Sequence, residues 1–329
     1  MSRLFFERFM KAKKILQNVY YIPGPTNVGV VSVLKKFGKT PDLYLIDSGG
    51  DREDAERIYN ELCELFPAEE GGFKLKAIIN THSHADHCGG NAFFVQKTGC
   101  KIWINDVEAA GLKNNLLQSI IHCGSMPLPH LQTSYFVAEP SKADRFIDSS
   151  VKIKLRDGSC FSFMDLPGHY LNMLGVIYTN KKGETVLFSG DAINGRNLIL
   201  KYWISYLVDL EAFKNTLCKL NDSSFTWYVP CHGDVVQRIQ ETVEMNQIAI
   251  LSTEASILKA LEGGKELTFS ELMKAVADMN ELNLRTAQYL LIGGTIKAYL
   301  YYLYDQKKID CTMKENQLFW KSASNSSFQ

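Results

Sequence analysis

The stretch THSHADHCGG, Thr81 to Gly90, concentrates potential metal ligands in one short segment. It contains His82, His84, Asp86 and His87, although the whole chain of 329 residues has only 7 histidines. Imidazole and carboxylate groups are the side chains that bind zinc and related cations in proteins. The stretch therefore raises the question of where the remaining ligands of a complete metal site lie.

The apolar segment LKAIINT, residues 75–81, runs directly into the histidines and predicts a strand. Side chains two positions apart point the same way at the end of a strand, whereas on a helix the matching pairs are four apart. We therefore expect His82 and His84 to bind one ion together. Asp86 and His87 follow in a turn and can reach a second ion.

Other apolar segments that predict strands also end in a residue of ligand type. They are FSFMDLPGH (Phe161 to His169), TVLFSGD (Thr185 to Asp191) and FTWYVPCHGD (Phe225 to Asp234, with His232). Rigid strands that end in functional loops are the usual way in which an α/β protein builds a site at one edge of its sheets. These exits supply the missing ligands.

The elements before the histidines alternate between strand and helix. Residues 18–34 predict a strand, a Pro/Gly turn and a second strand, and residues 43–50 predict another strand. Residues 51–66 have apolar positions at helical spacing, with Asp51 as a plausible N-cap. A further helix is expected to begin at about Asn91. The order favours an α/β fold.

The motifs HxHxDH, Gly-His, Gly-Asp and His-Gly follow one another in this order, each after a predicted strand. In this respect the chain resembles the metallo-β-lactamase-fold hydrolases over about residues 18–240. The resemblance implies an αββα sandwich with two metal sites at one edge. It also implies the ligands: His82, His84 and His169 for the first ion, Asp86, His87 and His232 for the second, and Asp191 bridging both.

These ligand types suit Zn²⁺, with iron or manganese as alternatives, so we expect two divalent metal ions. Ions about 3.5–4 Å apart would share a hydroxide and generate a nucleophile at neutral pH. Asp86 is the candidate catalytic residue, because it could orient that nucleophile or accept its proton. The predicted activity is that of a dinuclear metal-dependent hydrolase.

Three classes of reaction remain open at this point. The favoured one is hydrolysis of a small ester, thioester or lactone-like molecule. The second is a metal-dependent ribonuclease or phosphodiesterase, and the third is an iron-dependent redox enzyme of the same fold. With 36 Lys and Arg against 36 Asp and Glu, the chain has no global positive field, which argues against a nucleic-acid partner.

Composition also bears on the location of the chain. No segment approaches the roughly 20 apolar residues of a membrane span, and the first residues lack the apolar core of a signal peptide. The 8 cysteines are dispersed without a CxxC pair, as in a reducing compartment. We expect a cytoplasmic protein with no membrane partner.

The chain divides into a catalytic domain, residues 1–240, a mainly helical domain, 241–322, and a loose tail, 323–329. Three predicted helices and a hairpin in 241–322 resemble a winged helix, although its lysines and arginines are matched by acidic residues. The apolar third helix is expected to pack against the catalytic domain or to form the interface of a homo-oligomer. Residues 112–150 interrupt the catalytic domain and could form a lid over the metals.

Several polar residues stay outside the predicted site. His122 and His130 lie in the 112–150 segment without partner spacing, and we expect both to be structural. Asp47 fits a turn-capping carboxylate. Tyr170, where many relatives have a small hydroxyl residue, either lines the pocket or packs, and Cys231 is expected to be a packed, inert thiol.

Overall fold

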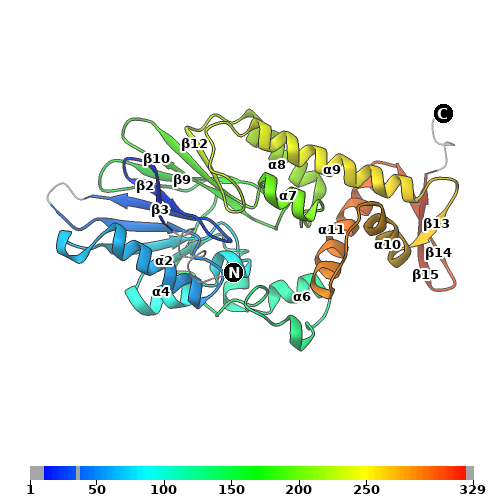
Figure 1. The fold of residues 1–329 in the computed structure, drawn as a ribbon, viewed down its shortest axis with the longest axis horizontal. Coiled ribbons are helices and arrows are strands. Elements are labelled where there is room, and N and C mark those ends of the chain that lie inside the picture. Colours follow the sequence, from blue (N-terminus) through cyan, green and yellow to red (C-terminus); the bar gives the residue numbers. More distant parts are fainter. Residues whose placement is uncertain (1–10, 35–37, 324–329) are drawn as a thin grey trace.

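Two mixed β-sheets form the centre of the N-terminal region in the computed structural model, which describes residues 11–34 and 38–323 (Figure 1). The first sheet has the strand order β1-β2-β3-β4-β5-β6-β7: β1 (Lys13–Leu16), β2 (Val19–Ile22), β3 (Val28–Val33), β4 (Asp42–Ile46), β5 (Lys74–Ile79), β6 (Lys101–Ile104) and β7 (Arg145–Phe146). The second has the order β12-β11-β10-β9-β8: β8 (Lys152–Lys154), β9 (Cys160–Asp165), β10 (Leu174–Thr179), β11 (Thr185–Gly190) and β12 (Trp227–Pro230).

Helices connect these strands and continue into the C-terminal region. The first part contains α2 (Arg52–Leu65), η1 (Ala68–Glu70), α3 (Ala85–Cys88), α4 (Asn91–Thr98), α5 (Ala109–Lys113), α6 (Leu117–Cys123), η2 (Pro129–Leu131), α7 (Arg196–Tyr202) and α8 (Leu210–Asp222). The C-terminal region contains α9 (Gln240–Ala260), α10 (Phe269–Met279), α11 (Thr286–Asp305) and a sheet of order β13-β15-β14: β13 (Glu266–Thr268), β14 (Ile309–Lys314) and β15 (Gln317–Ser322).

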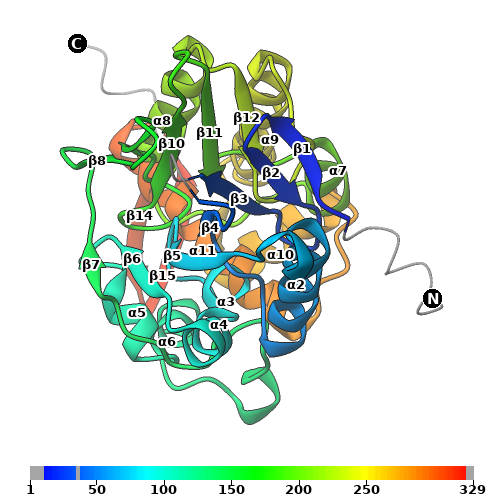
Figure 2. The ribbon, with the colours of Figure 1, turned by 90° about the vertical axis from the view of Figure 1, so that its left-hand side faces the viewer.

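Three hydrophobic clusters separate the layers of the sandwich. One cluster, with Ile58 and Phe94, packs α2 and α4 onto the first sheet. A second, with Ile79 and Phe188, fills the space between the two sheets. The third, with Leu217, packs α8 and the C-terminal helices onto the outer face of the second sheet. Figure 2 shows this helix–sheet–sheet–helix arrangement end on, which confirms the predicted αββα sandwich.

The direction of the strands explains why the ligand loops meet. β4, β5 and β6 are parallel, and β11 and β12 are parallel in the second sheet. Because the carboxyl ends of parallel strands share one edge, the loops after β4, β5, β11 and β12 emerge side by side. The loop after β9 reaches the same edge, since Leu174 N–H at the start of β10 donates to the Thr81 carbonyl at 2.9 Å.

The strand-based explanation of the HxH spacing was wrong. β5 ends at Ile79, so His82 and His84 lie in the loop beyond it, and His84 is the N-cap of the short helix α3. Asp86 and His87 lie on this helix rather than in a turn. Their directions are set by long-range contacts of the loop and not by strand alternation.

Other local predictions are confirmed. Asp51 caps α2 by accepting from Asp54 N–H at 2.9 Å, and α4 begins at Asn91. Thr268 caps α10 with Glu271 in a capping box. The predicted hairpin is β14 and β15. Strands β1, β6, β7, β8, β10 and β13 were not predicted.

The C-terminal region packs against the catalytic part through α9 and α11. Thr295 on α11 accepts a hydrogen bond from Leu207 N–H at 3.2 Å, and α11 also contacts α6 and α8. The sheet β13-β15-β14 lies at the end farthest from the sandwich (Figure 1). The third predicted helix, α11, therefore packs against the catalytic part of its own chain, which is the first of the two predicted alternatives. The winged-helix description stays a resemblance.

Two of the sequence predictions concern segments at the ends of the chain. The first ten residues and the predicted tail, apart from Ala323, lie outside the described residues. Across the described ranges, each helix is either too short or too polar to span a lipid bilayer.

Candidate metal centre

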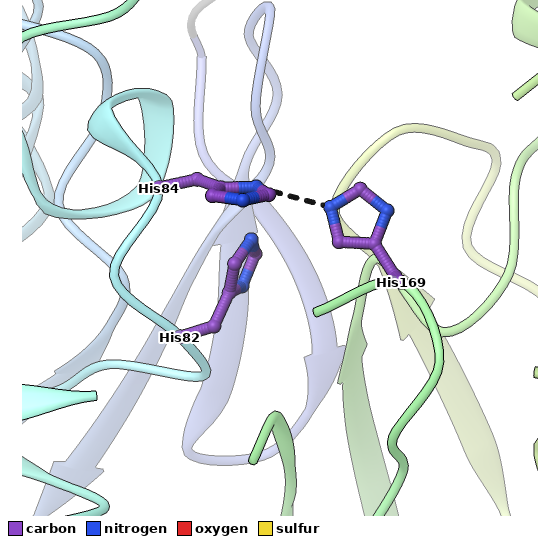
Figure 3. A group of neighbouring side chains, drawn as sticks. All are labelled: His82, His84 and His169. Carbon is purple, nitrogen blue, oxygen red and sulfur yellow. Dashed lines mark hydrogen bonds between the residues drawn. The ribbon is translucent and has the colours of Figure 1, made fainter. Parts of the chain in front are cut away.

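The loop after β5 and the loop after β9 bring three histidines together. Ligand atoms of His82, His84 and His169 all lie within 4.8 Å of one another, and Nδ1 of His84 is 3.1 Å from Nε2 of His169 (Figure 3). Nitrogen ligands of a tetrahedral zinc ion, each about 2.0–2.1 Å from the metal, lie about 3.3 Å apart. The group has the spacing that one cation requires.

A second group lies beside the first. Asp86 Oδ2 is 3.1 Å from Nε2 of His232 and 3.6 Å from Nε2 of His87. Asp191 adjoins both groups, because its Oδ2 is 3.4 Å from Nε2 of His169 and 3.3 Å from Nε2 of His232. The structure thus brings all seven predicted donors together, with Asp191 between the two groups.

Hydrogen bonds fix the ring orientation of four histidines. Nδ1 of His169 donates to the Tyr206 carbonyl at 3.0 Å, and Nδ1 of His232 donates to the Pro25 carbonyl at 2.8 Å. A carbonyl can only accept, so in both rings the proton is on Nδ1 and, in the neutral ring, Nε2 keeps a lone pair for a cation.

His82 and His87 are held in the same way by side chains. Nδ1 of His87 lies 2.9 Å from Asp47 Oδ2. Nδ1 of His82 lies 3.0 Å from Thr81 Oγ1, whose own hydroxyl donates to Asp47 Oδ2 at 2.9 Å. The Thr81 oxygen is left as the acceptor for His82, and Nε2 of both rings again points to the donor cluster.

Unpartnered polar atoms mark the same place. Within the described ranges, Nε2 of His82, Nε2 of His87 and Oδ1 of Asp191 are buried without a hydrogen-bond partner. A buried polar atom without a partner costs about 1–3 kcal/mol. Two divalent cations would satisfy these atoms, so the residues present fit the metals that the sequence predicts.

The two groups differ in their electrostatics. Burial lowers the pKa of His82 and His84 well below the ordinary histidine value, so these rings are neutral and able to bind a cation. Burial also acts to lower the pKa of His232, but Asp191 and Asp86 outweigh it and raise that pKa to about 10. The second group, with its two carboxylates, therefore favours positive charge.

Asp47, which the sequence analysis left outside the site, is the centre of a hydrogen-bond network behind it. Its carboxylate is fully buried and accepts from Thr81 N–H at 2.8 Å, Thr81 Oγ1, His87 Nδ1 and, at 3.4 Å, Cys231 Sγ. It thus orients His87. The signal was present in the sequence, because Asp47 ends a predicted strand just as His169 and Asp191 do.

Tyr170 and Cys231 are buried beside the donors. The Tyr170 ring packs against the His84 ring at 4.3 Å between centroids, and the side chain is 3% exposed. Burial raises the pKa of the Cys231 thiol. Both residues therefore pack behind the ligands, which for Cys231 agrees with the expectation of an inert thiol.

A cavity of about 740 Å³ opens onto the donor cluster. His84, Asp86, His169, Asp191 and His232 contribute to its wall. Binding sites for small molecules in proteins typically have volumes of about 300–1,000 Å³. A second cavity, of about 680 Å³, lies at the opposite edge of the sheets, and the seven donors are absent from its lining.

Three separate segments complete the wall of the larger cavity. The 112–150 segment contributes His122 and Phe136, α7 contributes Leu198 and Lys201, and α11 contributes Leu291. The 112–150 segment therefore lies where a lid would lie. Residues 145–146 of this segment form β7, the edge strand of the first sheet. Only the rest of the segment is therefore an insertion.

His122 lies close to the donor cluster, a position that its sequence context did not indicate. Its ring stacks on Tyr206 at 4.7 Å and lies 5.7 Å from the His84 ring, while Nδ1 is 3.2 Å from the Gln118 carbonyl. It is not part of the donor groups, as expected, but it faces the cavity and is a candidate contact for a substrate. His130 is exposed.

Comparison with known proteins gives the family. The sequence model of the Metallo-beta-lactamase superfamily matches residues 18–232. The chain belongs to this superfamily. Membership and the clustered donors together support a metal-dependent hydrolase.

Curated relatives within the superfamily are distant. The hydroxyacylglutathione hydrolase GloC of Haemophilus influenzae is 30% identical over 45% of this chain and 60% of its own length. An atrochrysone carboxyl ACP thioesterase of Aspergillus chevalieri is 21% identical over 70% of this chain and 79% of its own. The lactamase-like protein notP of an Aspergillus species is 22% identical over 77% of this chain and 64% of its own length.

Solved structures extend the likeness into the C-terminal region. A β-lactamase domain protein from Burkholderia ambifaria has a TM-score of 0.71 at 14% identity and covers 96% of this chain and 94% of its own. A metallo-β-lactamase family protein from Thermus thermophilus has a TM-score of 0.69 at 16% identity, over 94% of this chain and 100% of its own. At these identities the likeness shows the fold of the metallo-β-lactamase superfamily.

Proposed function

We propose that this chain is a dinuclear metal-dependent hydrolase of a small ester, thioester or lactone-like substrate, with thioesters the favoured class and zinc the favoured metal. The observation that carries the proposal is the cluster of seven donors, five of which line the 740 Å³ cavity. The preference for thioesters is supported by the names of two relatives, a hydroxyacylglutathione hydrolase and an ACP thioesterase.

The donors have distinct roles in this proposal. His82, His84 and His169 would hold one cation, Asp86, His87 and His232 would hold the other, and Asp191 would be shared between them. Two cations so placed would activate a water as the nucleophile and polarise the scissile carbonyl. Asp86 faces the cavity, where its carboxylate is 25% exposed, and it is the group placed to orient that water and accept its proton.

The surrounding chain would exclude water and orient the substrate. Leu198, Leu291 and Phe136 give the cavity an apolar wall on three sides. An acyl group could pack there while its carbonyl faces the donors, because apolar burial contributes about 25 cal/mol per Å². Lys201 and the ring of His122 are among the polar groups available to the rest of the substrate.

The metal content and substrate class can be tested together. We expect purified protein to hold two equivalents of zinc by elemental analysis and to hydrolyse thioesters fastest in a panel that also contains esters, lactones and phosphodiesters. A protein that binds only iron and turns over with oxygen or peroxide would instead establish the redox alternative. Preferential cleavage of phosphodiesters would establish the second alternative.

Replacement of a proposed ligand tests the role of the centre. We expect His169→Ala or Asp86→Ala to lower kcat/KM by about 10³-fold or more, which corresponds to about 4 kcal/mol of activation free energy. Bulk water cannot replace a nucleophile that is held and activated at the site. Asp222→Ala, at an exposed position at the end of α8, is the control and should leave kcat/KM unchanged. Full turnover by either ligand variant would contradict the assignment.

The charge of the cavity disfavours the ribonuclease alternative. Phosphate backbones require clustered positive charge. Among the described residues that line the cavity and are not proposed ligands, the carboxylates of Asp51 and Asp54 outnumber the ammonium group of Lys201. A salt-dependent RNA-binding assay tests this point directly, since the proposal expects no specific binding.

The remaining parts of the proposal rest on the sequence. A cytoplasmic location accords with eight cysteines that are all free thiols and all lie in described parts of the chain. A homo-oligomer is proposed through exposed aromatic residues such as Tyr301 and Tyr304 on α11. Size-exclusion chromatography with light scattering tests it.

A further inference from the structure

A buried carboxylate lies behind two of the ligand loops. Glu108 follows β6, directly before α5, and is 2% exposed. Its Oε2 accepts from Ser83 N–H at 3.1 Å and from Ser83 Oγ at 2.6 Å, and its Oε1 accepts from Asn172 N–H at 3.1 Å. Hydrogen bonds to an ionised carboxylate are roughly twice as strong as neutral ones, so these contacts hold the loops firmly.

Both contacts are made to loops that carry ligands of one metal. Ser83 lies between His82 and His84, and Asn172 lies on the loop that begins with His169. Glu108 therefore connects the pair of histidines after β5 to the single histidine after β9. The described contacts of Glu108 do not include the second group, whose members are held by Asp47, Pro25 and Thr26.

The backbone of α5 also lies close to the Ser83 side chain, at Gly111. A Cβ atom placed on Gly111 would lie 2.4 Å from Ser83 Oγ and 2.8 Å from Ser83 Cβ. Contacts below 3.0 Å force a shift, so only glycine fits here. The Ser83 hydroxyl is thus fixed between the Glu108 carboxylate and the Gly111 backbone.

We propose that Glu108 is a positioning residue that sets His82, His84 and His169 at the mutual spacing needed by the first cation. The inference rests on the metal assignment made under the proposed function. Removal of a group that orients a metal ligand typically lowers metal affinity about 10- to 100-fold. The effect should be confined to the first site, because the second is anchored elsewhere.

Glu108→Gln is the informative substitution. A glutamine has nearly the same shape but only one acceptor oxygen, so its amide NH₂ must face either the Ser83 or the Asn172 N–H group. One of the two loops then loses its anchor. Glu61→Gln is the matched control, because Glu61 on α2 is a carboxylate 9% exposed that accepts from Ala12 N–H, away from the metal ligands.

The experiment is a titration of the metal-free full-length chain with Co²⁺, followed by visible absorption, and with Zn²⁺ by competition with a chelator. For Glu108→Gln we expect one of the two equivalents to bind about 10- to 100-fold more weakly, with a changed absorption spectrum for that ion. The other equivalent and all values for Glu61→Gln should match the unsubstituted chain. Circular dichroism establishes that the variants are folded.

Each outcome bears on a separate claim. Two equivalents of unchanged affinity and spectrum in Glu108→Gln would overturn the inference while leaving the proposed function intact. Equal weakening of both equivalents would also overturn it, because the effect would then not be local. An unsubstituted chain that binds no Co²⁺ or Zn²⁺ would instead refute the metal assignment itself. If Glu108→Gln does not fold, Gly111→Ala displaces Ser83 with the carboxylate in place and is expected to give the same selective loss.

Discussion

Asp47 occupies a backbone conformation that few residues other than glycine adopt. Its φ is 62°, in the left-handed region, where Asn and Asp are the most tolerated of the larger residues. This conformation turns the chain at the end of β4 and directs the carboxylate at Thr81 and His87. The surrounding hydrogen bonds hold Asp47 in this strained conformation.

Asp47→Asn should weaken metal binding. The amide retains one acceptor oxygen, so either Thr81 N–H, which is bound by Oδ1, or both Thr81 Oγ1 and His87 Nδ1, which are bound by Oδ2, lose their acceptor. We expect the affinity for one metal equivalent to fall about 10- to 100-fold, with a corresponding loss of turnover at limiting metal. Chelator competition measures the affinity.

A carboxylate remote from the metals provides the control for this experiment. Asp144→Asn changes a side chain that accepts from Ile102 N–H at 3.0 Å and should leave metal affinity unaltered. If Asp47→Asn binds both equivalents as tightly as the Asp144→Asn control does, Asp47 does not orient His87 in the way described.

The seven candidate ligands could be selected from sequence because each follows an apolar strand and has a chemically distinctive side chain. The structure brings together all seven residues so selected. Asp47 has the same signature but also fits a turn cap, and one sequence cannot separate these roles. His122 has no such signature, since its proximity to His84 arises from the packing of α6 against α11.

At the scale of elements, the 112–150 segment contributes cavity-lining residues that are separate from the seven donors. α6 contacts α11, and Phe136 lines the cavity, while Met126 and Leu128 are more than half exposed. An apolar loop at the mouth of a cavity is placed to contact a substrate rather than to stabilise the fold.

Replacement of residues 125–135 by a short Gly-Ser linker should change substrate preference without changing metal content. We expect the ratio of kcat/KM for long and short acyl thioesters to shift by about tenfold, equivalent to about 1.4 kcal/mol, since the removed loop includes the cavity-lining Tyr135. Tyr135→Ala is the point variant, and Phe146→Ala, an exposed aromatic on β7, is its control. An unaltered ratio together with two bound metals would show that the loop is not part of the substrate site.

Strand periodicity predicted the elements better than it predicted the loops between them. The strands that precede His169, Asp191 and His232 are present, because apolar runs bounded by Gly and Pro leave few alternatives. The conformation of the HxH loop is instead set by partners distant in the sequence, such as Ser48 N–H to the His87 carbonyl at 2.8 Å. β1 and β13 have four and three residues with few buried side chains, too short for a periodic signal.

At the scale of the whole molecule, the second sheet and the C-terminal region share one hydrophobic core. The same buried cluster contains Leu217 on α8, Tyr228 on β12, Val243 on α9 and Ile296 on α11. The predicted boundary between residues 240 and 241 therefore crosses a continuous core, even though it coincides with the start of α9.

A chain that ends at residue 238 should not fold stably. Fully burying one large apolar side chain contributes about 1.5–3 kcal/mol, and the truncation uncovers several, whereas a whole domain has a net stability of about 5–15 kcal/mol. We expect loss of the thermal unfolding transition, binding of a hydrophobic dye, and aggregation. Glu315→Gln, at an exposed position between β14 and β15, is the control and should leave the midpoint of unfolding unchanged. A soluble, cooperatively unfolding product that still binds two metals would contradict this expectation.

The distribution of the donors along the chain has a consequence for biosynthesis. Four come from the segment directly after β5, but His169, Asp191 and His232 follow strands of the second sheet that are translated later. A growing chain on the ribosome can complete the first sheet while it still lacks the residues that close the coordination shell. In the proposed dinuclear site, the complete set of donors is therefore available only once the sandwich has assembled.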